Sequence, residues 1–132
     1  MGRVALVTGG TRGIGAAIAI ALKNAGRDVV VNYAGNDHAA REFEESTSIK
    51  VMKFDVSDHE AVAAATAQIE TDLGPIEILV NNAGITRDST MHRMTYEQWK
   101  EVIDTNLSGV FNCSRAVIEG MRERSFGRIV NI

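Results

Sequence analysis

Residues 8–15 have the sequence Thr8-Gly9-Gly10-Thr11-Arg12-Gly13-Ile14-Gly15, and they join a β-branched run to a segment of helical period. Glycines at positions 9, 13 and 15 let the backbone turn sharply and approach a ligand without clashes from Cβ atoms. The helix that begins here offers free N–H groups and the positive end of its dipole, which together suit a diphosphate. Taken alone, the segment also fits a plain tight βα turn, so the flanking elements decide the interpretation.

Short β-branched runs alternate with longer segments of helical period along the whole chain, which predicts an α/β fold around a parallel sheet. The strand segments are nearly continuous apolar runs, so helices are expected to cover both faces of the sheet. The predicted strands are Arg3–Thr8, Asp28–Tyr33, Ile49–Phe54, Ile76–Asn81 and Arg128–Ile132. The predicted helices are Arg12–Ala25, Asp37–Glu45, Asp58–Asp72 and Tyr96–Arg124.

Hydroxyl and glycine residues mark several helix boundaries. Two capping boxes, each a hydroxyl followed three residues later by Glu or Gln, are predicted at Ser57–Glu60 and Thr95–Gln98. Gly26 is predicted to end the first helix in a left-handed conformation, and Gly74–Pro75 is predicted to stop the third. The chain has no repeat, low-complexity tract or linker, so it is interpreted as one domain.

The composition supports a folded domain. The chain has 132 residues, of which 45% are hydrophobic, 23% charged and 5% aromatic, and these values exclude disordered, collagen-like and coiled-coil classes. Cys113 is the only cysteine, so no disulfide forms within the chain, and a single free thiol is typical of a reducing compartment.

The charge distribution disfavours two classes of partner. The formal net charge is −3 and the basic residues are scattered, so nucleic acid is not expected to bind. The early apolar run Val4–Val7 is too short for a signal peptide or a membrane span. We therefore expect a cytoplasmic protein that does not associate with membranes.

The glycine spacing Gly-x-x-x-Gly-x-Gly differs from the common Gly-x-Gly-x-x-Gly fingerprint and resembles the cofactor loop of the short-chain dehydrogenase/reductase family. Further features follow in the order typical of that family: Asp55-Val56, Asn81-Asn82-Ala83-Gly84, Asn106 and the run Gly127–Ile132. The resemblance implies a Rossmann-type doubly wound parallel sheet of order 3-2-1-4-5. Residues 1–132 would be its dinucleotide-binding domain.

The resemblance also implies where a dinucleotide binds. Gly9, Gly13 and Gly15 would frame the pyrophosphate, with Ile14 packed beneath it, and Thr8 would tie the first strand to the fourth. On the other side of the site, Asp55 would bond the adenine amino group and Val56 would supply a backbone contact. The residues expected along the ribose and nicotinamide are Asn82, Ala83 and Gly84. All these positions follow strands at the sheet edge where open α/β folds bind ligands.

The end of the second strand indicates which nicotinamide cofactor is used. NAD sites usually place an acid there, whereas this strand ends with Asn32 and Tyr33, which are assigned to the cofactor site. Arg12 lies in the glycine loop and can reach a 2′-phosphate, with a solvated loop cation as the alternative. Asp28 is at the wrong end of the strand, and Asp37 is expected to cap the next helix. The predicted cofactor is NADP(H).

Asn106 is the candidate catalytic residue within the chain. It falls on the predicted apolar stripe of the long helix, which comprises Trp99, Ile103, Val110, Cys113, Val117 and Met121. A buried amide needs a hydrogen-bond partner. The resemblance implies that Asn106 supports a water and proton relay to a lysine, and the alternative is a core amide satisfied by backbone.

The family's serine and its Tyr-x-x-x-Lys pair follow the fifth strand, and this sequence ends at Ile132. We therefore expect a chain truncated after that strand and inactive alone, with Ile129, Val130 and Ile132 on an uncovered edge open to pairing with another chain. The segment Tyr96–Lys100 matches Tyr-x-x-x-Lys literally but precedes Asn106, so it is not interpreted as the catalytic pair. The alternative function is an inactive module that binds nucleotide or self-associates through this edge.

Within the family the chain resembles NADPH-dependent reductases of 3-oxoacyl thioesters. The implied substrate is a thioester of CoA, such as acetoacetyl-CoA, or of acyl-carrier protein, and the implied assembly is a homo-oligomer. Arg87 is either a phosphate attractor at the substrate entrance or a plain loop cation. The histidines share no metal-ligand spacing and no metal is predicted. Cys113 is expected to be a small buried hydrophobe.

Overall fold

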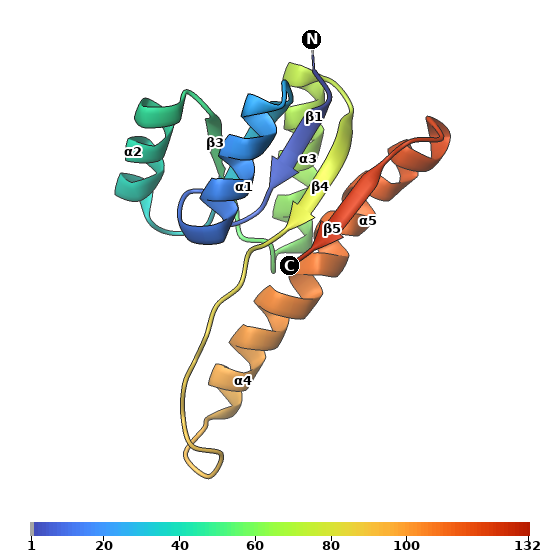
Figure 1. The fold of residues 1–132 in the computed structure, drawn as a ribbon. Coiled ribbons are helices and arrows are strands. Elements are labelled where there is room, and N and C mark those ends of the chain that lie inside the picture. Colours follow the sequence, from blue (N-terminus) through green and yellow to red (C-terminus); the bar gives the residue numbers. More distant parts are fainter. Residues whose placement is uncertain (1) are drawn as a thin grey trace.

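A computed structural model describes residues 2–132, and five parallel strands form its single sheet. The strand order is β3-β2-β1-β4-β5, which confirms the predicted topology (Figure 1). The strands are β1 Val4–Val7, β2 Asp28–Tyr33, β3 Lys50–Lys53, β4 Ile76–Asn81 and β5 Arg128–Asn131. Two are as predicted, and β1, β3 and β5 are shorter by one residue at one or both ends, within the usual uncertainty of element boundaries.

Helices pack on both faces of the sheet, as the apolar strand runs predict. They are α1 Gly13–Asn24, α2 Asp37–Thr47, α3 His59–Leu73, α4 Tyr96–Ile103, the π-helix η1 Asp104–Ser108 and α5 Gly109–Glu123. Alternate residues of β1 point to opposite faces, so Val4 and Leu6 join the core under α3 and α5 while Ala5 and Val7 join the core under α1. The sheet is thus sandwiched between two separate apolar cores.

Of the N-terminal helix caps predicted from the sequence, only the one at Thr95 agrees with the structure. Thr95 caps α4 in the predicted capping box, and its Oγ1 accepts from the N–H of Gln98 at 3.1 Å. The box predicted at Ser57–Glu60 is wrong, because Asp58 caps α3 instead. The cap predicted at Asp37 is also wrong, because the side chain of the preceding Asn36 accepts the helix N–H bond.

The predicted helix ends agree better with the structure. Gly26 follows α1 with a φ of +87°, which is the left-handed conformation that glycine adopts at no steric cost. Gly74 ends α3 directly before Pro75, which cannot continue a helix.

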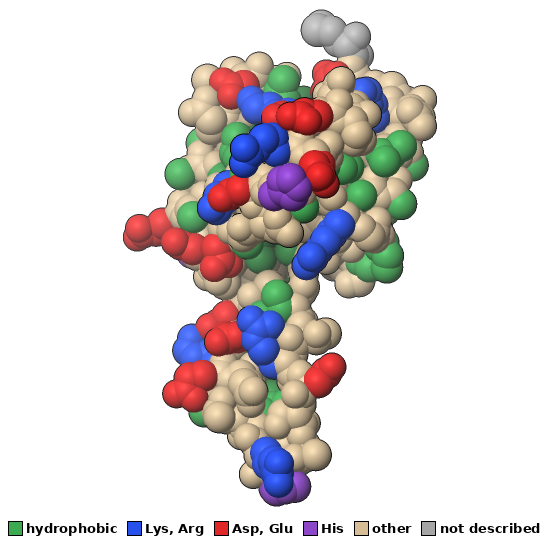
Figure 2. Space-filling model, turned by 90° about the vertical axis from the view of Figure 1, so that its left-hand side faces the viewer, with side chains coloured by type: hydrophobic (Ala, Val, Ile, Leu, Met, Phe, Trp, Pro, Cys, Tyr) green, Lys and Arg blue, Asp and Glu red, His purple; other side chains and the backbone are tan. Residues whose placement is uncertain are grey.

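The predicted long helix is interrupted at η1, and this shifts its apolar stripe. One π turn inserts an extra residue, so side chains before and after it do not share one face. Cys113, Val117 and Met121 are buried as expected, whereas Trp99 is 54% exposed. Figure 1 shows the reason: α4 and the loop before it project beyond the sheet, and Figure 2 shows this projection as a separate lobe with mixed charges. Trp99 therefore has no sheet to pack on.

The β5 edge is covered on one face only. β5 is an edge strand, as predicted, and on one of its faces Ile129 is partly buried against the core under α5. Val130 and Ile132 are 47% and 65% exposed, which confirms the expectation for them. Among the described residues, no helix combines the length and apolarity that crossing a membrane requires.

Candidate functional site

The glycine loop between β1 and α1 forms an open concave backbone. Gly13 has a φ of +58°, and a Cβ built there would meet no atom within 4 Å, so the space above this turn is free. Gly15 is crowded instead, because its Cβ would lie 2.3 Å from the carbonyl oxygen of Gly9. Glycine is thus required at position 13 for backbone conformation and at position 15 for close packing.

The first turn of α1 differs from the starts of α2, α3 and α4, the other helices that begin after a loop. The side chains of Asn36, Asp58 and Thr95 accept N–H bonds at the starts of α2, α3 and α4. Arg12 occupies the corresponding position of α1 and makes no such bond. Because the N–H groups of a first turn need acceptors, the start of α1 has the donors and the dipole that bind an anion. A diphosphate fits this arrangement.

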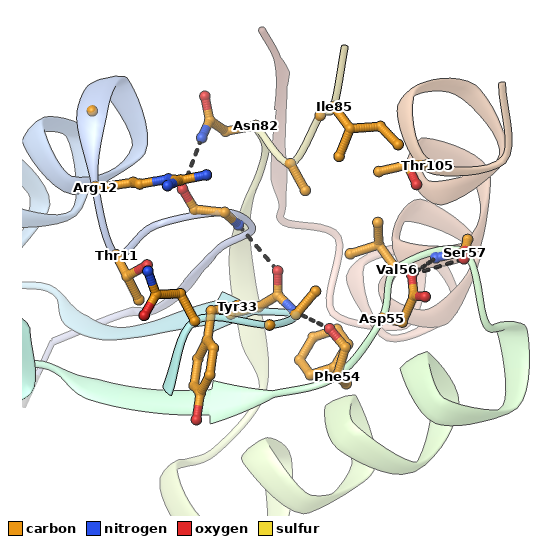
Figure 3. Close-up of a pocket in the computed structure, with 18 of the residues that line it drawn as sticks. Thr11, Arg12, Tyr33, Phe54, Asp55, Val56, Ser57, Asn82, Ile85 and Thr105 are labelled. Atoms are coloured by element: carbon orange, nitrogen blue, oxygen red, sulfur yellow. Dashed lines mark hydrogen bonds between the residues drawn. The ribbon is translucent and has the colours of Figure 1, made fainter. Parts of the chain in front are cut away.

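Two asparagine amides, one buried and one half-buried, hold the glycine loop in place. Asn32 is 2% exposed; its Oδ1 accepts from the N–H of Gly9 at 3.0 Å and its Nδ2 donates to the carbonyl of Phe54 at 2.6 Å. Asn82 donates through Nδ2 to the carbonyl of Gly9 at 3.1 Å, and Figure 3 shows these bonds meeting at the loop. Both ends of the Asn32 amide therefore bond protein backbone, and its direct role is to fix the loop.

Thr8 joins β1 to the segment that follows β4, as the resemblance implies. Its Oγ1 accepts from the N–H groups of Asn82 at 3.0 Å and Ala83 at 2.9 Å. This hydroxyl is buried, so both donors are satisfied without water. Thr8 therefore fixes the position of the Asn82–Gly84 segment beside the glycine loop.

A cavity of about 830 Å³ lies over the carboxyl ends of the strands, within the size range of cofactor sites. It brings together all the predicted cofactor residues except Thr8 and Gly15, which are buried and do not line it. The predicted residues that line it are Gly9, Arg12, Gly13, Ile14, Asn32, Tyr33, Asp55, Val56, Asn82, Ala83 and Gly84. Arg87, a candidate for the substrate entrance, also lines it, together with residues that were not predicted: Thr11, Ala34, Gly35, Asn36, Phe54, Ser57, Ile85, Glu101, Asp104 and Thr105.

An acidic turn after β3 forms the side of the cavity opposite the glycine loop. Asp55 Oδ1 accepts from the N–H and the hydroxyl of Ser57, at 2.9 and 2.7 Å (Figure 3). These bonds orient the carboxylate and explain why Ser57 does not cap α3. An Asp side chain that bonds the backbone N–H two residues later forms an Asx turn, so Asp55 was the signal for this turn in the sequence.

The same turn is held from α5 by a residue that the sequence analysis did not identify. Asn112 is 8% exposed and donates through Nδ2 to the carbonyl of Val56 at 2.9 Å. Gly109 allows this contact, because a Cβ there would lie 2.7 Å from Val56 Cγ2. Since one asparagine in a helix has no distinctive pattern, only the fold identifies this pair.

Arg12 and Tyr33 line different parts of the cavity, Arg12 from the glycine loop and Tyr33 from the end of β2. The Arg12 side chain is exposed and extends across the glycine loop on the side of Asn82 (Figure 3). The Tyr33 hydroxyl points away from Arg12 and donates to Asp37 at 3.0 Å. Arg12 therefore remains available to an anion, while the Tyr33 hydroxyl is engaged outside the cavity.

Asn106 lies in η1 and is exposed, so its predicted burial is wrong. Its Oδ1 accepts from the N–H of Ile85 at 2.8 Å and its Nδ2 donates to the carbonyl of Ile85 at 2.9 Å. The π turn removes this residue from the core stripe. The alternative of a core amide satisfied by backbone is therefore correct for the backbone partner and wrong for the burial, and the amide holds the loop after β4 in place.

Other candidate groups have partners that account for them. Lys100 Nζ bonds Asp104 at 2.5 Å, which raises the pKa of the lysine, and Tyr96 is 72% exposed. This agrees with excluding that pair from catalysis. Arg87 Nε bonds Glu101 at 2.7 Å. Burial raises the pKa of the Cys113 thiol to about 12, so the cysteine is a neutral core residue. Among residues 2–132, no three His, Cys, Asp or Glu side chains are grouped for a metal ion.

Comparison with known proteins accounts for this geometry. The short-chain dehydrogenase family model matches residues 3–132. The chain belongs to the short-chain dehydrogenase family. Members of this family are oxidoreductases that use nicotinamide cofactors, which suits a cavity with an anion-binding turn at one side and an oriented carboxylate at the other.

Curated relatives in the short-chain dehydrogenase family are similar over the whole chain. It is 64% identical over 132 residues to an acetoacetyl-CoA reductase from Paracoccus denitrificans, covering 54% of that protein. It is 62% identical to an acetoacetyl-CoA reductase from Rhizobium meliloti, covering 55%. It is 43% identical to the 3-oxoacyl-[acyl-carrier-protein] reductase FabG from Staphylococcus aureus, covering 56%. The chain thus spans about half the length of these relatives.

Proposed function

We propose that residues 1–132 form the NADP(H)-binding domain of a reductase that converts a 3-oxoacyl thioester, such as acetoacetyl-CoA, into the 3-hydroxyacyl thioester. The observation that carries this proposal is the uncapped start of α1 beneath a cavity of about 830 Å³. The similarity to acetoacetyl-CoA reductases supports the substrate class. Similarity to FabG keeps a carrier-protein thioester as the second form of the substrate.

Each side of the cavity has a role in this proposal. The N–H groups at the start of α1 hold the diphosphate, with Ile14 beneath it, and the Asp55 carboxylate accepts from the adenine amino group beside Val56. The segment Asn82–Gly84 lies along the ribose and nicotinamide. The bound cofactor supplies the hydride, and the residues of this chain orient it.

The preference for NADP(H) rests on charge at the end of β2. Arg12 lies at the cavity with an exposed guanidinium, and it can bond a 2′-phosphate through two parallel N–H groups. No acid lines that part of the cavity, where Tyr33 and Asn36 lie instead. An NAD site would place a carboxylate there to hold the 2′-hydroxyl.

Catalysis needs groups that the resemblance places after β5. A tyrosine near its ordinary pKa is a poor acid at neutral pH unless a cation lowers that pKa. We expect the 132 residues alone to bind cofactor without turnover, because Tyr96 and Lys100 lie outside the cavity. In the complete enzyme Asn106 supports the proton relay, and its two bonds to Ile85 hold the loop after β4 in place. We also propose a cytoplasmic location and a homo-oligomeric assembly for the complete enzyme.

The test is a titration of the purified protein with NADPH and NADH, followed by incubation with NADPH and acetoacetyl-CoA. We expect NADPH to bind more tightly than NADH and to remain unoxidised. Asp55→Ala should weaken NADPH binding, whereas Asp72→Ala, a surface change at an acid paired with Lys50, should not. Equal or reversed affinity overturns the cofactor assignment, oxidation at an enzymatic rate overturns the expected inactivity, and no binding overturns the proposal.

The exposed β5 edge favours a second candidate, an inactive module that binds nucleotide and self-associates. Val130 is 47% exposed on a strand whose outer side has no pairing partner among the described residues, and such edges pair with other chains. Sedimentation of the native protein and of Val130→Lys at two concentrations tests this candidate, because pairing through β5 predicts a mass that rises with concentration in the native protein and not in the variant.

A further inference from the structure

An ionic cluster lies just outside the cavity where β2 and β3 end. The two strands are parallel and their register pairs Tyr33 with Lys53, so both side chains leave the sheet at the same edge. The Tyr33 hydroxyl donates to Asp37 Oδ1 at 3.0 Å. Lys53 Nζ lies 3.2 Å from Asp37 Oδ1 and 3.4 Å from Oδ2. One carboxylate is thus held from two strands.

Asp37 is the acid nearest in sequence to the end of β2, the place where a carboxylate decides between the two nicotinamide cofactors. Its neighbour Asn36 lines the cavity and Asp37 does not. The hydrogen bonds from Lys53 and Tyr33 lower the pKa of Asp37, so the carboxylate stays charged while its charge is compensated locally. A free carboxylate one residue from the cavity wall would repel a 2′-phosphate and accept from a 2′-hydroxyl.

We propose that Lys53 and Tyr33 set the preference for NADP(H) over NAD(H) by holding Asp37 away from the ribose end of the cavity. The inference rests on the proposed function, since it concerns the same nucleotide site. Lys53 does not line the cavity, so it acts through Asp37 as a positioning residue. Both members of the ion pair are about half exposed, with 52% and 54% of their side-chain surface accessible, so the effect is that of a surface pair.

The experiment measures dissociation constants for NADPH and NADH at low salt in four proteins: native, Lys53→Gln, Lys53→Gln combined with Asp37→Asn, and Lys50→Gln. Lys53→Gln should reduce the NADPH preference by about two- to fivefold, as expected for an exposed pair. The double variant, which also lacks the Asp37 charge, should recover the native NADPH preference. Lys50→Gln removes the same charge from the same strand, but its partner is Asp72, so the preference should not change.

The double variant separates the inference from a direct contact. If Lys53 attracted the 2′-phosphate itself, the preference would stay low after Asp37→Asn, and the inference would be overturned. Unchanged preference in Lys53→Gln would overturn it as well. If native protein binds neither cofactor, the inference fails together with the proposed function. Tyr33→Phe removes only the hydroxyl that bonds Asp37, and it should also reduce the NADPH preference. It therefore provides a second test if Lys53→Gln fails to fold.

Discussion

At the carboxyl ends of β1 and β2 the loops are held by buried polar side chains, whereas along β5 and the outer side of α5 apolar side chains face solvent. Thr8 and Asn32 are 1% and 2% exposed, and each bonds two or more backbone groups of the cavity loops. Val130 and Phe111 are 47% and 63% exposed. We refer to these two regions as the cavity flank and the β5 flank.

The contrast shows how far each flank depends on hydrogen bonds within the chain. The cavity flank contains its own hydrogen-bond partners, so the loop conformation is fixed before any ligand arrives and little ordering cost accompanies binding. The β5 flank has a covering helix on one face only among the described residues. Substitutions should therefore be costly on the cavity flank and nearly neutral on the β5 flank.

The largest expected effect is that of Asn32→Ala. The change leaves the N–H of Gly9 and the carbonyl of Phe54 without their buried partner. Each unsatisfied buried group costs about 1–3 kcal/mol, so the free energy of unfolding should fall by about 2–5 kcal/mol, measured by urea denaturation.

Asn131→Ala is the matched control, since Asn131 occupies the corresponding end of β5. It is exposed and accepts from Asn81 Nδ2 at 2.9 Å, and Asn81 also bonds the Ser114 hydroxyl at 3.2 Å. Its loss should cost about 1 kcal/mol or less, because water can replace it. Equal costs for the two asparagines would remove the contrast between the flanks.

The cavity flank was also the region that the sequence predicted best. The glycine turn, the strand before it and the helix after it depend on neighbouring residues, so local patterns predicted the turn, while the roles of the cofactor residues came from the family resemblance. Asn32 shows the limit: its place at the cavity was predicted, yet both ends of its amide bond the backbone of Gly9 and Phe54, so the amide is not free to bond a cofactor. Which way a side chain points at the end of a strand depends on loops far along the chain.

The long helix was predicted least well, for a physical reason. A period of three to four residues cannot reveal a π turn, because one inserted residue leaves the pattern on each side intact. Asn106 was therefore placed in the core, whereas η1 exposes it and sets it against Ile85. The contact of Asn112 with Val56 joins residues 56 positions apart and has no local signal.

An intermediate effect is expected for Gly15→Ala on the cavity flank. The new Cβ would lie 2.3 Å from the carbonyl oxygen of Gly9 and 2.5 Å from Asn82 Nδ2, so the loop must move. Overpacking of this kind costs about 1–3 kcal/mol of stability. Because the moved loop is the diphosphate site, NADPH affinity should fall about tenfold or more, equal to about 1.4 kcal/mol, by calorimetric titration.

Gly120→Ala is the control for that substitution. Gly120 lies within α5, and the atoms nearest to a Cβ there belong to the guanidinium of Arg124, the far end of a flexible side chain that also donates to the carbonyl of Ile76 at 3.2 Å. Alanine is the better helix former by about 0.5–1 kcal/mol, so stability should be unchanged or slightly higher, with native NADPH affinity. A similar affinity loss in both variants would show that the effect is not specific to the loop.

The smallest effect is expected for Val130→Thr, and the same change at Val31 calibrates it. Val31 is fully buried in β2, so the hydroxyl of Val31→Thr should lower the free energy of unfolding by about 1–3 kcal/mol. Val130 is half exposed, so Val130→Thr should change the free energy of unfolding by less than about 0.5 kcal/mol. Denaturation at two protein concentrations is the measurement, because a dimer that covers β5 would make the Val130 cost depend on concentration. A large concentration-independent cost at Val130 would mean that this face of β5 is buried within one chain, and the contrast between the flanks would fail.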